Sequence, residues 1–188
     1  MKKSINIKAA IYPMPVLMVA TYDENGTVDV MNAAWGTQCS SDKLVLCLSA
    51  RHKTAKNLRL TGACTVALAD AAHMKEADYF GIASGNDMAD KFERSGLTAV
   101  KSNLVNAPVI AEFPLTMECE LLEEIDGANL HCFIVKVVGT LADERILKED
   151  GKICVHRLDA LTFNQFRNKY FTTGEKAGDA WGAGKELM

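Results

Sequence analysis

Two short polar segments of this chain carry residue types suited to binding a ligand. In Asn32-Ala33-Ala34-Trp35, an amide and an indole stand beside two small side chains, a combination that lets a flat polar ring approach the backbone. In Ser49-Ala50-Arg51-His52-Lys53-Thr54-Ala55-Lys56-Asn57, cations and hydroxyls stand together, which suits a phosphate group. Each segment follows a strand-like run, so a small antiparallel fold would bring both within reach of one ligand.

Each segment also has a less specific interpretation. Arg51, Lys53 and Thr54 could form an anion site where a strand leads into a helix, or they could belong to a solvated basic turn. Trp35 could stack on a ligand, line a pocket or simply fill the core. What favours a ligand site is topology, because the ends of the second and third strands can lie side by side in a small antiparallel barrel.

The strands and turns around these segments are expected to position them. Pro15 to Thr21 is apolar and extended, and Thr27 to Met31 alternates at the strand period. Between them, Tyr22 to Gly26 ends in an Asn-Gly pair that favours a hairpin turn. The next expected elements are a strand, a short helix closed by Gly62, and another strand, over Lys43 to Ser49, His52 to Leu60 and Ala63 to Ala69.

The second half of the chain adds a helical insertion and longer strands. His73 to Gly96 has a polar helical pattern that Ser84-Gly85-Asn86-Asp87 interrupts. Further strands are expected over Leu115 to Ile125, Leu130 to Thr140 and Ile153 to Leu161, with Asp126-Gly127-Ala128 joining the first two. Several short β runs separated by turns, without regular βαβ alternation, predict a mainly β, largely antiparallel fold that forms a closed or partly closed barrel.

Composition limits the class of protein. At 188 residues and 48% hydrophobic, the chain is expected to form a single domain, residues 1–188, in which the glycine-rich stretch 170–188 is a flexible end or an arm over a partner subunit. A net charge of −3 provides no basic field for nucleic acid. No run approaches the roughly 20 apolar residues that span a bilayer, and no secretory apolar core follows the first residues, so a cytoplasmic location without membrane attachment is expected.

The sequence lacks the motifs of a disulfide framework, a metal site and a Rossmann dinucleotide site. The six cysteines are scattered and mostly lie in apolar runs, which favours buried free thiols over disulfides or a zinc site. His131 and His156 are expected to be structural or surface residues. The sequence contains no HExxH pattern and no G-x-G-x-x-G opening a βαβ unit, so neither a metal site nor a Rossmann dinucleotide site is predicted. No general acid or base is nominated.

In their order along the chain, the segments resemble the flavin reductase-like, flavoredoxin-type family of FMN-binding split-barrel proteins. The resemblance runs through nearly the whole chain and implies a homodimer of six-stranded antiparallel Greek-key barrels with short peripheral helices. It also implies that FMN is held noncovalently near the subunit interface. The elements that carry it are Tyr12-Pro13-Met14-Pro15-Val16, Asn32 to Trp35, Arg51 to Asn57, Ser84-Gly85 with Asp90-Lys91-Phe92, and Tyr170-Phe171 to Gly178.

Carried over by position, the resemblance implies which residues would contact FMN. Those bordering the isoalloxazine would be Asn32, Ala33, Ala34 and Trp35. Those around the ribityl phosphate would be Ser49, Ala50, Arg51 and Thr54, while Lys91 and Phe92 would close the site. His52, Lys53 and Asn57 complete the expected set.

The activity implied by the resemblance is oxidoreduction through bound FMN. NADH or NADPH would donate hydride, and a flavin, a small molecule or a protein would accept the electrons. Without a Rossmann unit, the nicotinamide would dock transiently over the exposed flavin face. A noncatalytic flavoprotein, acting as an electron carrier or a redox-sensing binding module, is the alternative, and a barrel that has lost its flavin is the third.

Overall fold

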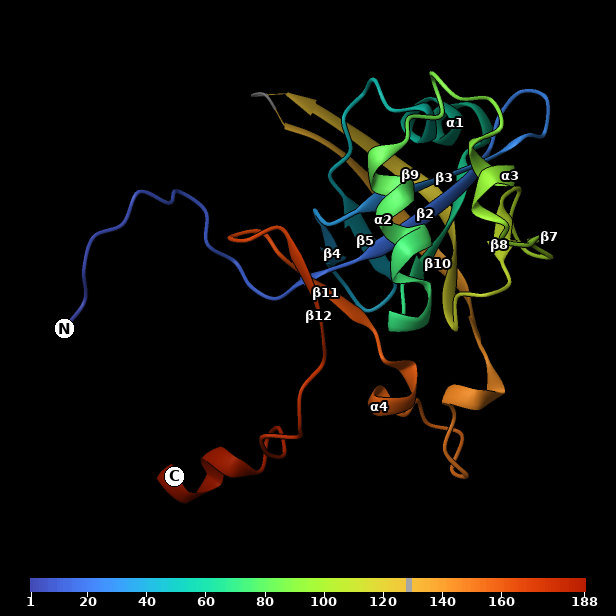
Figure 1. Ribbon diagram of the computed structural model, residues 1–188. Coiled ribbons are helices and arrows are strands. Elements are labelled where there is room, and N and C mark those ends of the chain that lie inside the picture. The colour runs from blue at the N-terminus through green and yellow to red at the C-terminus, as the bar shows by residue number, and fades with distance from the viewer. Residues whose placement is uncertain (128–129) are drawn as a thin grey trace.

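The computed structural model describes residues 1–127 and 130–188, and one curled antiparallel sheet dominates it (Figure 1). The strand order of this sheet is β3-β2-β6-β9-β10-β5-β4. Its strands are β2 Leu17–Tyr22, β3 Val28–Ala33, β4 Gly36–Gln38, β5 Lys43–Leu46, β6 Ala63–Leu68, β9 Leu115–Gly127 and β10 Leu130–Ala142.

The two edge strands of the sheet are consecutive in the chain. β3 ends at Ala33 and β4 begins at Gly36, so only two residues, Ala34 and Trp35, connect opposite edges. A Cβ atom on Gly36 would lie 2.7 Å from Cδ1 of Leu17 in β2, so β4 also packs closely against the far side of the sheet. A link this short brings the edges together, and the sheet therefore curls into a split barrel.

Successive side chains of a strand point to opposite faces of the sheet, so the apolar residues of the strands are divided between two cores. In β2, Leu17 and Val19 point into the barrel, where they join a buried cluster that includes Phe133. Their neighbours Met18 and Ala20 point outward, into a second buried cluster under the peripheral helices. The nearly continuous apolar run of β2 thus reflects burial on both faces.

Short helices cover the barrel. α1, Lys53–Thr61, lies across one end and contributes Ala55 and Leu58 to the barrel core. α2, Met74–Ile82, and α3, Lys91–Ser95, lie over the outer face of β2 and β3, where Phe80 and Phe92 are buried (Figure 1).

The remaining elements are small and lie around this body. A second sheet has the order β1-β11-β12, and β7 pairs with β8 as a separate hairpin. The bounds are β1 Met14–Pro15, β7 Ala99–Lys101, β8 Pro108–Ile110, β11 Leu161–Asn164, β12 Lys169–Thr172 and α4 Val155–Leu158, with 3-10 turns at Ala71–His73, Glu144–Ile146 and Ala183–Leu187.

Most of the predicted elements are confirmed. The mainly β split-barrel fold with short peripheral helices is the one observed, although the described sheet has seven strands rather than six because the three-residue β4 pairs with β5. The predicted hairpin, the helix ending at Gly62 and the interrupted helical insertion all occur within a few residues of their expected bounds. In the predicted turn at 126–128, Ala128 lies outside the described residues.

One predicted strand is wrong. Most of the stretch from Ile153 to Leu161 forms the single turn α4, whose first carbonyl, on Cys154, accepts hydrogen bonds from the backbone nitrogens of Arg157 and Leu158. Asp159 then takes a left-handed conformation, with φ of 46°, and β11 begins only at Leu161. Local apolar character predicted a strand here, but the chain must turn before it can reach β1.

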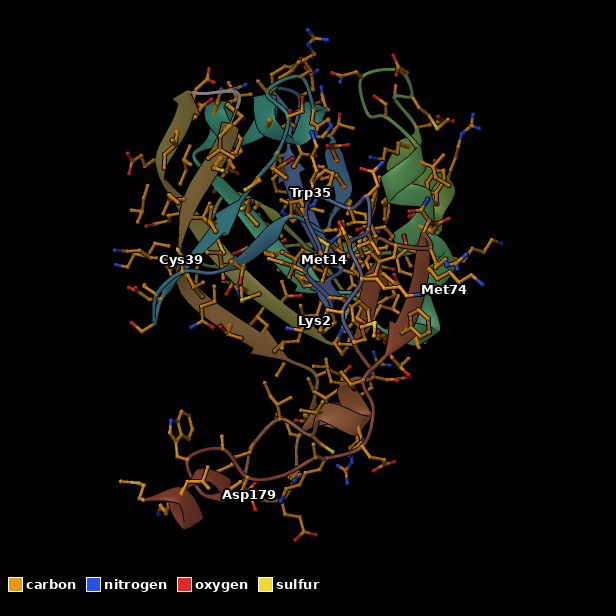
Figure 2. All side chains as sticks on the ribbon, turned by 90° about the vertical axis from the view of Figure 1, so that its left-hand side faces the viewer. Lys2, Met14, Trp35, Cys39, Met74 and Asp179 are labelled. Atoms are coloured by element: carbon orange, nitrogen blue, oxygen red, sulfur yellow. The ribbon has the colours of Figure 1, made fainter. Side chains whose placement is uncertain are left out.

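Both termini extend away from the barrel (Figure 1). The first twelve residues are exposed, and the segment after β12 that carries Asp179 lies below the body in Figure 2. Among the residues that the structure describes, no helix has the length and apolar character needed to cross a membrane.

Candidate functional site

A groove runs between the barrel and the segment from α2 to α3. Its first part, here called the tryptophan cavity, has a volume of about 290 Å³, and its walls include Asn32 to Trp35, Ile82 and Tyr170. Its second part, the lysine cavity, has a volume of about 280 Å³, and its walls include Lys53 and Lys91. The two cavities share Met31, Asn32, His52, Gly81 and Ile82, so they form one continuous groove.

Asn32 is fixed at the middle of this groove by hydrogen bonds. Its Nδ2 donates to the carbonyl oxygen of Ala77 in α2, 2.9 Å away, and to the hydroxyl of Tyr170 in β12, 3.4 Å away. Since Ala77 O can only accept, the contact fixes which end of the amide is nitrogen. The acceptor that Asn32 can offer a ligand is therefore its carbonyl oxygen.

Tyr170 joins the C-terminal hairpin to α2. Its hydroxyl donates to Oδ1 of Asp78, 2.9 Å away, and burial together with this carboxylate raises the pKa of Tyr170 to about 12. The phenol is thus neutral and acts as a donor throughout the physiological range. α2 packs directly against Asn32 at Gly81, where an added Cβ would lie 3.4 Å from Cβ of Asn32.

Trp35 lies at the rim of the tryptophan cavity and is 66% exposed. Its indole therefore does not fill the core, which removes one of the interpretations left open by the sequence. Its carbonyl oxygen accepts a hydrogen bond of 2.8 Å from the backbone nitrogen of Cys47. Figure 2 looks onto the face that carries Trp35, above Met14 of β1.

The lysine cavity lies at the N-terminus of α1. His52 is the N-cap residue in an extended conformation, and among the described residues no side chain caps this end of the helix. The first turn also contains no acidic residue. Free backbone N–H groups at an uncapped helix start attract anions. Burial and the neighbouring Lys91 lower the pKa of His52, so its ring is expected to be neutral.

Both lysines of this cavity are paired with carboxylates. Nζ of Lys53 lies 3.0 Å from Oδ2 of Asp23, and Nζ of Lys91 lies 3.5 Å from Oδ1 of Asp29. Burial lowers the pKa of Lys91, and Asp29 partly offsets this effect. Oδ2 of Asp29 also accepts a hydrogen bond of 2.6 Å from the Thr54 hydroxyl. Asp29 thus links Thr54 to Lys91 below the groove.

The structure brings together eight of the thirteen expected site residues in the walls of the groove: Asn32, Ala33, Ala34, Trp35, His52, Lys53, Thr54 and Lys91. Ser49 and Ala50 lie instead in a neighbouring open cavity of about 610 Å³, here called the outer cavity, which shares Trp35 with the groove. Arg51 is exposed, and its carbonyl oxygen accepts a hydrogen bond of 3.0 Å from Nδ2 of Asn86.

Two expected site residues, Asn57 and Phe92, are buried and contact other elements of the fold. Asn57 is buried, and its Nδ2 donates to the hydroxyl of Thr21, 3.1 Å away, which fastens α1 to β2. Phe92 is buried beneath α3, where its ring stacks on Phe80 with centroids 6.4 Å apart. Neither side chain was distinguishable from a site residue by its position in the sequence.

Several wall residues were not predicted as parts of the site. Asp29 was interpreted only as a member of a hairpin strand, and α2 only as part of an insertion. A polar residue at a buried strand position was the available signal for Asp29. The other unpredicted wall residues of the tryptophan cavity are Met31, Cys47, Leu48, Asp78, Gly81, Ile82, Phe163 and Tyr170, and those that line the lysine cavity but not the tryptophan cavity are Phe80, Ala83, Ser84 and Gly85.

Comparison with known proteins identifies the family. Residues 9–168 match the flavin reductase like domain, and the chain belongs to this family. The structure is similar to the flavoredoxin of Desulfovibrio vulgaris (Miyazaki F), with a TM-score of 0.93 and 33% identity over 98% of this chain and 100% of that one. It is also similar to the flavoredoxin of Methanosarcina acetivorans, with a TM-score of 0.91 and 26% identity over 100% of both chains.

Another relative is an uncharacterized protein of Aeropyrum pernix, 28% identical over 143 residues. The match covers 74% of this chain and 54% of that protein, so the chain spans about half the length of this relative. Membership of the flavin reductase-like family supports a flavin-binding redox function.

Proposed function

We propose that the groove binds FMN and that the protein is an oxidoreductase, taking hydride from NADH or NADPH and passing electrons to a flavin, a small molecule or a protein. Bound FMN supplies the redox chemistry, because its ring exchanges electrons singly or in pairs. The residues of the chain bind and orient it. The observation that carries the proposal is the continuity of the tryptophan cavity with the lysine cavity.

The tryptophan cavity fits the ring of FMN. Ala33 and Ala34 leave the backbone accessible, Trp35 provides an exposed indole, and Ile82 supplies an apolar wall. The carbonyl oxygen of Asn32 can accept a hydrogen bond from the polar edge of the ring. Such a wall, apolar with a few fixed polar groups, is typical of cofactor sites.

The lysine cavity fits the phosphate. The uncapped start of α1 offers backbone donors, and Lys53 and Lys91 supply positive charge. The carboxylates of Asp23 and Asp29 neutralise part of that charge, so the phosphate would share the lysines with them. Arg51 is exposed and directly precedes the N-cap residue His52, and it would add the remaining charge-assisted contact by moving its side chain over the groove.

An absorption spectrum tests the proposal. The purified protein is recorded alone, after addition of FMN, and then after anaerobic addition of NADPH or NADH. Bound flavin that bleaches with nucleotide supports the reductase. Protein that cannot be loaded with FMN overturns both flavin functions and leaves the barrel as an interaction scaffold.

The second candidate is a noncatalytic electron carrier or redox-sensing module. It is favoured by the similarity over nearly the whole chain to two proteins called flavoredoxins. Stopped-flow mixing of the FMN-loaded protein with each nucleotide separates the two candidates. Bleaching by neither NADH nor NADPH, with bleaching by dithionite, would favour the carrier.

We also propose that the protein is a homodimer in which the terminal segments, including residues 170–188, contact the partner subunit. Large apolar side chains on these segments are exposed, among them Ile11 at 74% and Trp181 at 94%. Exposed apolar groups of this size are typical of interfaces. Light scattering coupled to gel filtration, on the full chain and on a chain ending at residue 172, tests the dimer and the role of the tail.

A further inference from the structure

Two pairs of cysteines face each other across neighbouring strands. Cys47 follows β5 and Cys132 lies in β10, and their Sγ atoms are 3.0 Å apart. The pairing of Leu46 with Phe133 places Cys47 opposite Cys132 in this antiparallel ladder. Cys64 of β6 and Cys119 of β9 are direct register partners. All four are free thiols.

The backbone geometry of both cysteine pairs is compatible with a disulfide bond. Directly opposed residues of an antiparallel ladder have Cα atoms about 4.5–5.5 Å apart, within the range of about 4.4–6.8 Å found for disulfides. A bond could therefore form by rotation of the side chains, without separation of the strands.

The two pairs differ in access to small molecules. Cys64 and Cys119 are both 0% exposed, inside the barrel core. Cys47 is only partly buried, and it contributes to the walls of both the tryptophan cavity and the outer cavity. Cys132 lies behind it and is 3% exposed. A molecule in either cavity can thus reach Cys47, and through Cys47 its partner.

We propose that Cys47 and Cys132 form a redox-active dithiol that reacts with small-molecule disulfides, Cys47 attacking and Cys132 resolving. The thiolate of Cys47 attacks one sulfur of a disulfide R–S–S–R, so that one thiol RSH leaves and the other RS group stays bound to Cys47 as a mixed disulfide. The thiolate of Cys132 then attacks Sγ of Cys47 and releases the second RSH. The protein dithiol loses two electrons and two protons, and the external disulfide gains both.

The outer cavity suits a small uncharged disulfide. Its volume is about 610 Å³, and its walls include Trp35, Leu48, Ala50 and Leu130 beside Cys47. The ionisable groups on this side are His131, which also lines the cavity, and Glu124 and Arg59, which are bound to His131 and to each other. These groups already have partners, so none adds a free charge to the cavity.

The pKa of Cys47 predicts how this reaction depends on pH. Burial, together with the neighbouring Cys132 thiol, raises the pKa of Cys47 to about 11. The thiolate fraction, and with it the rate of attack, should therefore rise about tenfold per pH unit through the neutral range. Cys154 provides a contrast, because hydrogen bonds from the backbone nitrogens of Arg157 and His156 lower its pKa.

Disulfide mapping tests the proposal in full-length protein carrying Cys39→Ser and Cys154→Ser, which removes the exposed and the other partly exposed thiol. Folding of this background is checked by circular dichroism. The reduced protein is incubated with 2-hydroxyethyl disulfide, quenched with acid, unfolded, alkylated and analysed by peptide mass spectrometry. We expect loss of two hydrogen atoms, with Cys47 and Cys132 protected from alkylation and Cys64 and Cys119 still alkylated.

Single substitutions separate the two roles. Added to the same background, Cys132→Ser should accumulate a mixed disulfide on Cys47 that carries a 2-hydroxyethylthio group, and Cys47→Ser should leave Cys132 unmodified. The assignment does not depend on flavin binding, because the flavin-free protein gives the same readout. Continued alkylation of both Cys47 and Cys132, or oxidation of Cys64 and Cys119 at an equal rate, would overturn it, as would a Cys132→Ser protein without the adduct.

Discussion

The side chains of Asn32 and Tyr170 meet across 138 residues of sequence, with Nδ2 of Asn32 donating to the tyrosine hydroxyl 3.4 Å away. The same hydroxyl donates to Asp78 at 2.9 Å. One phenol thus joins β3, α2 and β12 at the tryptophan cavity. The C-terminal hairpin is therefore part of the groove wall as well as the start of the tail.

The substitution Tyr170→Phe tests this connection. It removes the hydroxyl but leaves Asn32 bonded to Ala77, so the amide should lose part of its restraint. We expect FMN affinity to fall about fivefold, the equivalent of one hydrogen bond of about 1 kcal/mol. Fluorescence titration with FMN measures it. The matched control is Tyr12→Phe, since among the described residues the Tyr12 hydroxyl makes no hydrogen bond. Equal FMN affinities of the two variants would show that the Tyr170 hydroxyl only attaches the C-terminal hairpin to α2 and does not contribute to binding.

The buried pair of Asp29 and Lys91 predicts a non-additive effect on stability. Asp29→Asn leaves the Lys91 ammonium without its carboxylate in a site where both side chains are at least 94% buried. We expect a loss of about 3–5 kcal/mol in the free energy of unfolding. Adding Lys91→Met should restore most of that loss, because the double variant has no unpaired charge. Urea unfolding measures each variant.

Asp150→Asn is the control for this cycle, because the contacts of Asp150 are an exposed ion pair with Lys152 and a hydrogen bond from the Lys152 backbone nitrogen, so loss of its charge should change little. A double variant no more stable than Asp29→Asn alone would show that Asp29 acts through its hydrogen bond with Thr54 instead.

The fold was predictable because its signals are local. The Asn25-Gly26 turn, the alternation of β3 and the glycine that ends α1 each depend on a few adjacent residues. The segment from Asn32 to Trp35, which lines the tryptophan cavity, also stood out because its four residues are adjacent in the sequence. The roles of Asp29 and Tyr170 were not, because each depends on partners from distant elements that only the folded chain brings together.

Burial explains why some expected site residues do not line the groove. Phe92 and Asn57 have the right types and positions for a ligand site, but their side chains turn into the core and toward Thr21. A single sequence does not distinguish a polar residue that binds a ligand from one that fastens two elements together. The same limit applied to Cys47 and Cys132, which were expected only to be small buried apolar residues.

Gly139 of β10 provides a test of packing on the outer face of the long hairpin. A Cβ there would lie 2.6 Å from Oε2 of Glu118 and would also overlap Cδ1 of Leu104. Glu118 is buried and bonded to the Ser102 hydroxyl at 2.5 Å, so it has little freedom to move. We expect Gly139→Ala to lower the free energy of unfolding by about 1–3 kcal/mol.

Gly127→Ala is the control in the same hairpin, since no heavy atom of the described residues lies within 4 Å of a Cβ built there. Its effect should stay within about 0.5 kcal/mol. Equal denaturation midpoints for the two variants would mean that the side chains of Leu104 and Glu118 move aside without loss of stability.

His131 and Glu124 give the stability a defined pH dependence. The hydrogen bond to the carbonyl oxygen of Leu48, followed by that to Glu124, raises the pKa of His131 above its ordinary value of 6.5. Its contribution is therefore complete below pH 6.5 and is lost as the pH rises through the raised pKa. Hydrogen bonds from Arg59 and His131 lower the pKa of Glu124 from 4.5 to about 2, so its contribution is complete above pH 4.5 and is lost toward pH 2.

The hydrogen-bonded network of Arg59, Glu124 and His131 therefore stabilises the fold most between pH 4.5 and pH 6.5. The substitution Glu124→Gln tests this pH dependence. We expect this variant to lower the pKa of His131 in an NMR titration, while the hydrogen bond to the Leu48 carbonyl continues to raise it. The decrease in melting temperature above pH 6.5 should also become shallower than in the parent protein. Glu123→Gln, an exposed neighbour, is the control. An unchanged His131 titration in Glu124→Gln would show that the Leu48 carbonyl alone sets its pKa.

Arg51 gives the sharpest test of the phosphate end, because its side chain is exposed and can be removed without disturbing the core. If it closes over the phosphate, Arg51→Ala should lose a charge-assisted contact worth about 1.5–3 kcal/mol and weaken FMN binding about 10- to 100-fold. The effect should be larger for FMN than for riboflavin, which lacks the phosphate, and it should shrink at high salt. Arg167→Ala, also exposed, controls for the loss of one surface charge. Equal losses for FMN and riboflavin would place Arg51 elsewhere than at the phosphate and leave the start of α1 with Lys53 and Lys91 as its binding site.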